Sequence, residues 1–175
     1  VDCEGDAEAV LLRISNAVQN IVENGGFPVG LGGEHTVTFG IINGLIEAGI
    51  EDFGIVQIDA HADLRDAYEG NPFSHASVRK NIHKFDLPAD FPDKVFFTVD
   101  VDGLDPSVFP STGTPVPGGL AWYQTLALFE SVAQQAQIIG FDIMEFAPIE
   151  GFHAYEFSAA LLAYKMMGIV ERNQL

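Results

Sequence analysis

Three side chains of the kinds that bind metals stand at alternate positions after an apolar run. Asp59, His61 and Asp63 follow residues 53–58, FGIVQI, which have the composition of a buried β-strand. Side chains two residues apart point the same way in an extended strand, so the three can converge beyond its carboxyl end. Open α/β sheets bind ligands at that edge. The spacing therefore predicts a binding site rather than an ordinary polar loop.

The same spacing returns at Asp100 and Asp102, at the end of the apolar run 95–101. If the two strands are neighbours in a parallel sheet, four aspartates and one histidine meet at one edge, and His35 joins them from a third strand-to-helix turn. This mostly oxygen ligand set favours Mn²⁺ over zinc, while nickel, iron and cobalt stay open. Six ligands are more than one catalytic metal takes while keeping a position open. We therefore expect two metals with a hydroxide between them as nucleophile.

The segment DVDGLDPS, which starts at Asp100, also begins like the calcium-binding loop of an EF-hand. Counted from Asp100, Asp105 falls where that loop needs glycine, and Ser111 falls where it needs a bidentate glutamate. The segment also follows a strand. The spacing therefore argues against calcium.

Alternating helices and strands must position these ligands. Apolar residues repeat at helical spacing in four segments, 6–24, 36–48, 122–133 and 155–172. Short apolar runs at 27–31, 53–58, 95–101 and 137–144 indicate strands that are covered on both faces. The last helix is apolar on most faces, so we expect it to be buried.

This order predicts an α/β fold with three layers, α-β-α, around a mainly parallel sheet. At 175 residues and 47% hydrophobic content, one domain spanning 1–175 suffices. Residues 64–94 are polar and irregular, and such a long structureless segment is unusual in a compact domain.

The composition excludes several functional classes. A formal charge of −17 argues against nucleic acid and favours a small cationic partner. Cys3 is the only cysteine, so neither a disulfide framework nor a thiolate zinc site is expected. The sequence shows no apolar run of about 18 residues and no signal-like start, so we expect a cytoplasmic protein without a membrane partner.

Together these motifs resemble the ureohydrolases, the family of arginase and agmatinase. The sequence GGEH at 32–35 is similar to the family's G-G-D-H, residues 59–63 to D-A-H-x-D, and residues 100–106 to D-x-D-x-x-D-P, in the same order. Glu34 departs from the pattern, because aspartate is commoner there. A longer side chain at that position is expected to alter the support of the neighbouring ligands.

The resemblance implies two Mn²⁺ ions per subunit. One ion takes His35 and Asp63, the other takes His61 and Asp102, and Asp59 and Asp100 bridge the pair. The implied set is the same six residues that the spacing brings together.

Two further residues gain a role from the resemblance. His75, in Ser-His-Ala-Ser, matches the family's proton-carrying histidine, which protonates the departing amine. Glu145 matches the glutamate of D-x-x-E-x-x-P, whose carboxylate can accept paired hydrogen bonds from a planar guanidinium.

The implied activity is hydrolysis of a guanidino compound to urea and an amine, with agmatine, which yields putrescine in polyamine biosynthesis, as the best substrate. Guanidinobutyrate, guanidinopropionate, guanidine and formiminoglutamate stay open. Alternatives from other classes are a single-zinc deacetylase of related fold and a non-catalytic metal-binding subunit. By analogy with family assemblies we expect a homotrimer or homohexamer.

Members of this family are usually well over half as long again as this chain. The missing length predicts an incomplete sheet and a segment that is absent from this chain. We expect the residues on either side of the absent segment to be joined near 79–83. An enzyme that is really this short would lack strands, and its activity would be in question.

Overall fold

Four parallel strands form the centre of the molecule. The structure is a computed structural model that describes residues 1–2, 4–61 and 86–174. The strands are β1 (Val29–Leu31), β2 (Phe53–Ile58), β3 (Lys94–Asp100) and β4 (Gln137–Met144). They lie in the order β1-β4-β3-β2, and every described pair is parallel. The sheet that the apolar runs predicted is therefore present.

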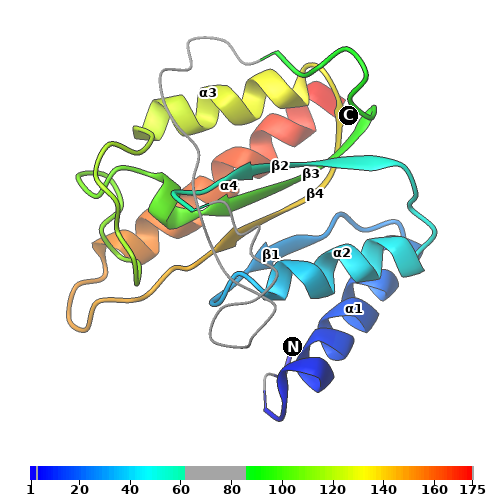
Figure 1. Cartoon of the computed structure of the whole chain (residues 1–175), viewed down its shortest axis with the longest axis horizontal. Coiled ribbons are helices and arrows are strands. Elements are labelled where there is room, and N and C mark those ends of the chain that lie inside the picture. Colours follow the sequence, from blue (N-terminus) through cyan, green and yellow to red (C-terminus); the bar gives the residue numbers. More distant parts are fainter. Residues whose placement is uncertain (3, 62–85, 175) are drawn as a thin grey trace.

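Helices cover both faces of this sheet, which gives the three expected layers (Figure 1). The four long helices are α1 (Ala7–Glu23), α2 (Val37–Glu47), α3 (Trp122–Ala133) and α4 (Ala154–Gln174). The helices α1 and α2 pack on one face, and α3 and α4 pack on the other. Asp6 caps the start of α1, because its side chain accepts a hydrogen bond from Ala9 N at 2.8 Å.

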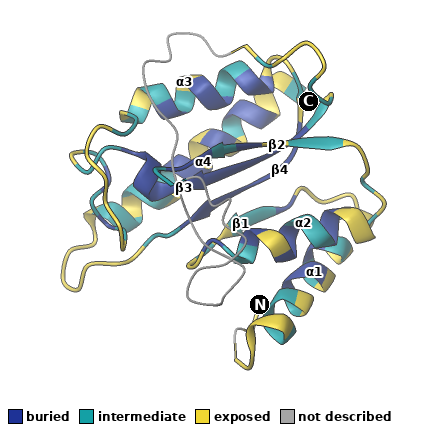
Figure 2. Cartoon of the chain, viewed as in Figure 1, coloured by how far each residue is buried: buried dark blue, intermediate teal, exposed yellow. Residues whose placement is uncertain are grey.

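The core consists of two clusters separated by the sheet, whose central strands β3 and β4 are largely buried (Figure 2). On the α3 and α4 side, the fully buried rings of Phe97 and Phe129 meet edge to face with centroids 4.8 Å apart. On the other side, Gly44 of α2 lets two helices approach closely. A Cβ at Gly44 would lie 2.5 Å from Ser15 O on α1.

The expectation that the last helix is buried all round is wrong. Residues such as Leu162 and Met166 are buried on one face of α4, but Phe157 and Tyr164 are 70% and 68% exposed on another. Tyr123 of α3 is likewise 81% exposed. An apolar pattern shows which faces can be buried, not which faces another element covers. None of the described helices combines the length and the hydrophobicity needed to cross a membrane.

Three sequence predictions fall outside the described residues. Asp63 and His75 lie there, and so does the junction expected near 79–83. Most of the irregular segment 64–94 lies there too, up to the residues that precede β3. These remain predictions.

Candidate metal centre

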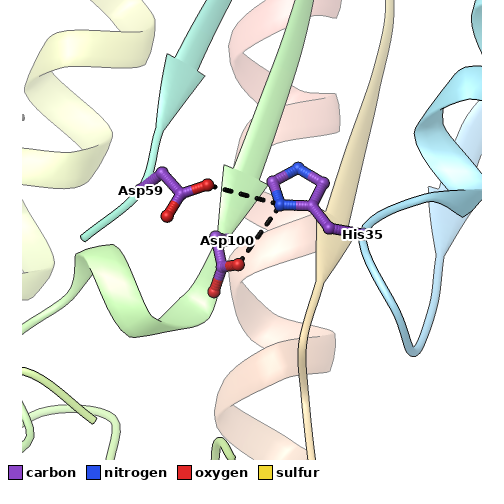
Figure 3. Close-up of side chains that lie close together, drawn as sticks. All are labelled: His35, Asp59 and Asp100. Atoms are coloured by element: carbon purple, nitrogen blue, oxygen red, sulfur yellow. Dashed lines mark hydrogen bonds and ion pairs between the residues drawn. The ribbon is translucent and has the colours of Figure 1, made fainter. Parts of the chain in front are cut away.

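The carboxyl ends of β2 and β3 bring the two aspartate motifs together. The strands pair in register, with Ile58 opposite Val99, so Asp59 and Asp100 occupy neighbouring positions just past that pair. His35 lies in the turn between β1 and α2, and its ring reaches the same place (Figure 3). The meeting of three strand ends was expected from sequence.

The reason that we gave for the alternate spacing is wrong in part. The strand β2 ends at Ile58, before the first ligand, and β3 ends at Asp100, after which residues 101–103 form a 3₁₀ turn. Each motif is instead bent by its own first carboxylate. Asp59 Oδ1 accepts a hydrogen bond from His61 N at 2.7 Å, and Asp100 Oδ1 accepts one from Asp102 N at 2.8 Å. This local side-chain-to-backbone bond, typical of aspartate at turns, folds the third residue back toward the first.

Five of the predicted ligands form two groups that share Asp59. In the first group, His35 Nδ1 lies 3.2 Å from Asp100 Oδ2 and 3.4 Å from Asp59 Oδ2 (Figure 3). In the second group, His61 Nδ1 lies 2.8 Å from Asp102 Oδ2 and 3.7 Å from Asp59 Oδ1. The candidate ligand atoms of each group lie within 4.8 Å of one another. Each oxygen of Asp59 therefore faces a different histidine.

The site concentrates negative charge away from water. Asp59, Asp100 and Asp102 are only 3%, 0% and 1% exposed. Burial, with the like charges of Asp102 and Asp59, raises the pKa of Asp100 to about 7, although its contact with His35 acts the other way. Carboxylates packed in this way are costly unless a cation or a proton neutralises them.

A proton on His35 supplies part of that neutralisation. Burial alone lowers the pKa of His35, but its contacts with Asp100 and Asp59 outweigh burial and raise the pKa to about 10. The pKa of Asp59 is lowered, because the hydrogen bonds from His35 and His61 outweigh its burial. The site thus stabilises positive charge. Its carboxylate and imidazole ligands fit hard divalent ions such as Mn²⁺.

A loop that sequence reasoning did not single out holds Asp102 in place. Asp102 Oδ1 accepts a hydrogen bond from Ala60 N at 3.0 Å, and Asp102 Oδ2 accepts one from Thr114 Oγ1 at 3.0 Å. The loop returns to the site because Leu120 N donates to Gly103 O at 2.9 Å. The nearest signal in the sequence is the stretch TGTPVPGG at 112–119. Its glycines and prolines predict a turn, but they do not show which residues the turn contacts.

Glu145 also reaches the site. It follows β4 with a positive φ of 59°, a conformation that non-glycine residues adopt mainly under local constraint. Its Oε1 accepts a hydrogen bond from His35 N at 2.7 Å. Glu34 is directed elsewhere, because its Oε1 accepts hydrogen bonds from Thr36 N and Thr36 Oγ1 at 3.2 and 2.6 Å. The longer side chain at position 34 thus caps its own turn.

Comparison with known proteins gives matches along nearly the whole chain. A family model described as the Arginase family matches residues 1–90 and 86–168. An N(1)-aminopropylagmatine ureohydrolase of Synechocystis sp. is 36% identical over 209 residues, which cover 95% of this chain and 68% of that protein. An N(1)-aminopropylagmatine ureohydrolase of Thermus thermophilus is 34% identical, covering 83% of this chain and 63% of that protein.

A solved structure gives the same result. The agmatine ureohydrolase of Thermoplasma volcanium superimposes with a TM-score of 0.76 at 28% identity, over 95% of this chain and 70% of that chain. This chain therefore spans between 63% and 70% of the length of these three relatives. With the fold, the order of the motifs and the sequence matches in agreement, the chain belongs to the arginase family and is similar to its agmatinase-like ureohydrolases.

Proposed function

We propose that this protein hydrolyses a guanidino compound to urea and an amine with two Mn²⁺ ions. The observation that carries the proposal is the pair of ligand groups that share Asp59, each with one histidine and buried carboxylates. The first group would hold one ion with His35, Asp59 and Asp100. The second would hold the other with His61, Asp59 and Asp102. Asp63 and the bridging role of Asp100 complete the proposed set from sequence.

The protein's own residues prepare the reaction. The two ions would act as Lewis acids and lower the pKa of water enough for it to attack at neutral pH. Asp59, just past the end of β2, and Asp100, the last residue of the neighbouring strand β3, would hold the ions. We assign delivery of a proton to the departing amine to His75, because imidazole exchanges protons near neutral pH.

Glu145 is the proposed anchor of the guanidinium group. Its backbone is held by a hydrogen bond from Glu145 N to Gly33 O at 2.8 Å, and one carboxylate oxygen is held by His35 N at 2.7 Å. A carboxylate fixed in this way beside the ligands can face a planar cation without a further loss of side-chain entropy.

Agmatine is the proposed substrate, and N(1)-aminopropylagmatine is the second candidate. The first is favoured by the likeness to the agmatine ureohydrolase of known structure. The second, which the sequence motifs did not indicate, is favoured by the names of the Synechocystis and Thermus relatives. Both carry the same guanidino head and differ in the tail, so the metal centre cannot separate them.

Urea release across a panel of guanidino compounds tests this proposal. The panel contains agmatine, N(1)-aminopropylagmatine, arginine and guanidinobutyrate, each with added Mn²⁺, and Asp102→Ala is measured beside the wild type. We expect urea from one of the first two compounds and a large loss in the variant. A variant that keeps its rate would refute the two-metal assignment. One tightly bound zinc with no urea release would instead favour the deacetylase.

Three further expectations belong to the proposal. Assembly into a homotrimer or homohexamer is tested by light scattering of the purified protein, and cytoplasmic location by cell fractionation. The single domain with an absent internal segment is supported by the alignment with the Synechocystis relative, which spans 209 residues and so exceeds the 175 residues of this chain. We propose that this extra length includes a segment without a counterpart here.

A further inference from the structure

A fully buried carboxylate behind the metal centre has no part in the proposed reaction. Asp142 lies within β4 and is 0% exposed. Burial raises its pKa to about 6, although the hydroxyls of Thr98 and Thr38 act in the opposite direction. Thr38 Oγ1 donates to Asp142 Oδ2 at 2.7 Å, which leaves Asp142 Oδ1 for the donors of β3, where the Thr98 hydroxyl and the Val99 backbone N–H also lower the pKa of this carboxyl. Burying such a group is expensive, so its presence calls for an explanation.

The surroundings of Asp142 are shaped to hold it. Gly30 of β1 lies opposite Asp142 in the sheet, and a Cβ at Gly30 would come within 2.8 Å of Asp142 Cβ. On the other side, Thr98 of β3 is its register partner. The carboxylate thus sits between two strands, in space that a larger residue at position 30 would remove.

Thr98 connects this carboxylate to His35. Thr98 is 2% exposed, and its Oγ1 lies 2.8 Å from His35 Nε2. The other ring nitrogen, Nδ1, faces Asp59 and Asp100. A histidine that offers Nδ1 to a metal carries its hydrogen on Nε2, and a protonated histidine carries one there too. In both states Nε2–H donates to Thr98 Oγ1.

The direction of the remaining bond follows from the hydrogen count. A hydroxyl has one hydrogen, and Thr98 Oγ1 already accepts from His35, so its own hydrogen is available for another acceptor. Asp142 is the register partner of Thr98 in the sheet, and the Thr98 hydroxyl lowers the pKa of this buried carboxyl as a hydrogen-bond donor does, while Thr38 occupies its other oxygen, Oδ2. The Thr98 hydroxyl thus accepts from His35 and donates to Asp142, which joins the three groups into one chain.

We infer that Asp142 is a positioning residue that acts through Thr98 to hold the His35 ring with Nδ1 turned toward Asp59 and Asp100. This role rests on the proposed function, because it assigns His35 as a metal ligand. The chain runs from His35 Nε2–H to Thr98 Oγ1 and from Thr98 O–H to Asp142 Oδ1. It fixes the tautomer and the orientation of the ligand before a metal arrives.

The first test measures Mn²⁺ affinity by calorimetry. Thr98→Val keeps the shape of the side chain but removes the hydroxyl, and we expect affinity to fall about 10-fold to 100-fold, as for other partners of metal-bound histidines. Thr98→Ser should restore most of it. Thr125→Val is the matched control, because Thr125 is also buried, at 1% exposure, and its hydroxyl donates to Ala121 O, away from the site.

A double variant shows whether Thr98 and Asp142 act on Mn²⁺ affinity through one hydrogen-bond chain or independently of each other. If Asp142 acts only through Thr98, adding Asp142→Asn to Thr98→Val should cost little further affinity. Independent losses that multiply in the double variant would overturn the inference, as would Thr98→Val binding Mn²⁺ like the wild type.

The second test needs no metal and no turnover. In ¹⁵N-labelled metal-free protein, the Nε2–H of His35 should give a downfield proton signal protected from solvent exchange in the wild type and Thr98→Ser. The signal should be lost or shifted in Thr98→Val. A His35 ring without a hydrogen on Nε2 would refute the chain. If the wild type neither binds Mn²⁺ nor releases urea, the proposed function fails, but this signal still decides whether the chain exists.

Discussion

Replacing Asp59 should damage both ligand groups, whereas replacing Asp102 should damage one. Asp59 Oδ2 faces His35 Nδ1 at 3.4 Å, and Asp59 Oδ1 faces His61 Nδ1 at 3.7 Å. The side chain of Asp59→Asn has only one oxygen, and His61 N will keep that oxygen as its acceptor. The amide NH₂ then points into the His35 group, where it cannot bind a cation. We expect loss of that ion and weaker binding of the other.

The size of the effect follows from ligand linkage. An ion present at 100 times its Kd stabilises the folded state by about 2.7 kcal/mol. Two such ions should raise the free energy of unfolding of the wild type by about 5 kcal/mol. Asp102→Asn should retain about half of this gain, and Asp59→Asn should retain less than half.

Urea denaturation with and without Mn²⁺ measures these gains, and calorimetry counts the ions bound. Asp90→Asn serves as the control, because it removes one exposed carboxylate from the segment before β3, away from the site. It should keep both ions. Two ions bound by Asp59→Asn, or none bound by Asp102→Asn in a folded protein, would show that the two groups do not share Asp59 as described.

Three other perturbations follow from the same geometry. Glu145→Gln keeps an acceptor for His35 N but loses its charge, so KM for the guanidino substrate should rise about 10-fold or more in steady-state assays, and an unchanged KM would remove Glu145 from the binding site. Gly103→Ala would place a Cβ 2.8 Å from Asp59 N, so chemical denaturation should show a loss of about 1–3 kcal/mol, and unchanged stability would mean that this contact relaxes freely. The metal-free protein should lose stability as pH rises from about 4 to 10, because the pKa of Asp100 is raised from 3.8 to about 7 and that of His35 from 6.5 to about 10, so that Asp100 accounts for the lower part of the range and His35 for the upper part. Thermal melts across this range should show the fall, saturating Mn²⁺ should reduce it, and a flat profile without metal would contradict the charge balance described.

The sequence predicted the strands and the meeting of their ends closely. The runs 53–58 and 137–144 are strands with the predicted bounds. A strongly apolar segment bordered by polar residues shows clearly where a buried strand begins and ends. The two aspartate motifs could also be placed, since parallel strands end at the same edge of a sheet.

Other parts of the site depend on pairings that no local pattern reveals. Thr98 and Asp142 each look like an ordinary polar residue within a strand. They become partners only because β3 and β4 are neighbours with these residues in register. Thr114 reaches Asp102 through the return of a loop, which depends on long-range packing. The exposed face of α4 was misjudged for the same reason, because periodicity does not show what covers a helix.

Two Mn²⁺ ions should bind at the described groups and share Asp59. Anomalous diffraction from crystals soaked in Mn²⁺ tests this expectation directly. We expect two peaks, one beside His35, Asp59 and Asp100 and the other beside Asp59, His61 and Asp102. A single peak, or peaks away from Asp59, would contradict it.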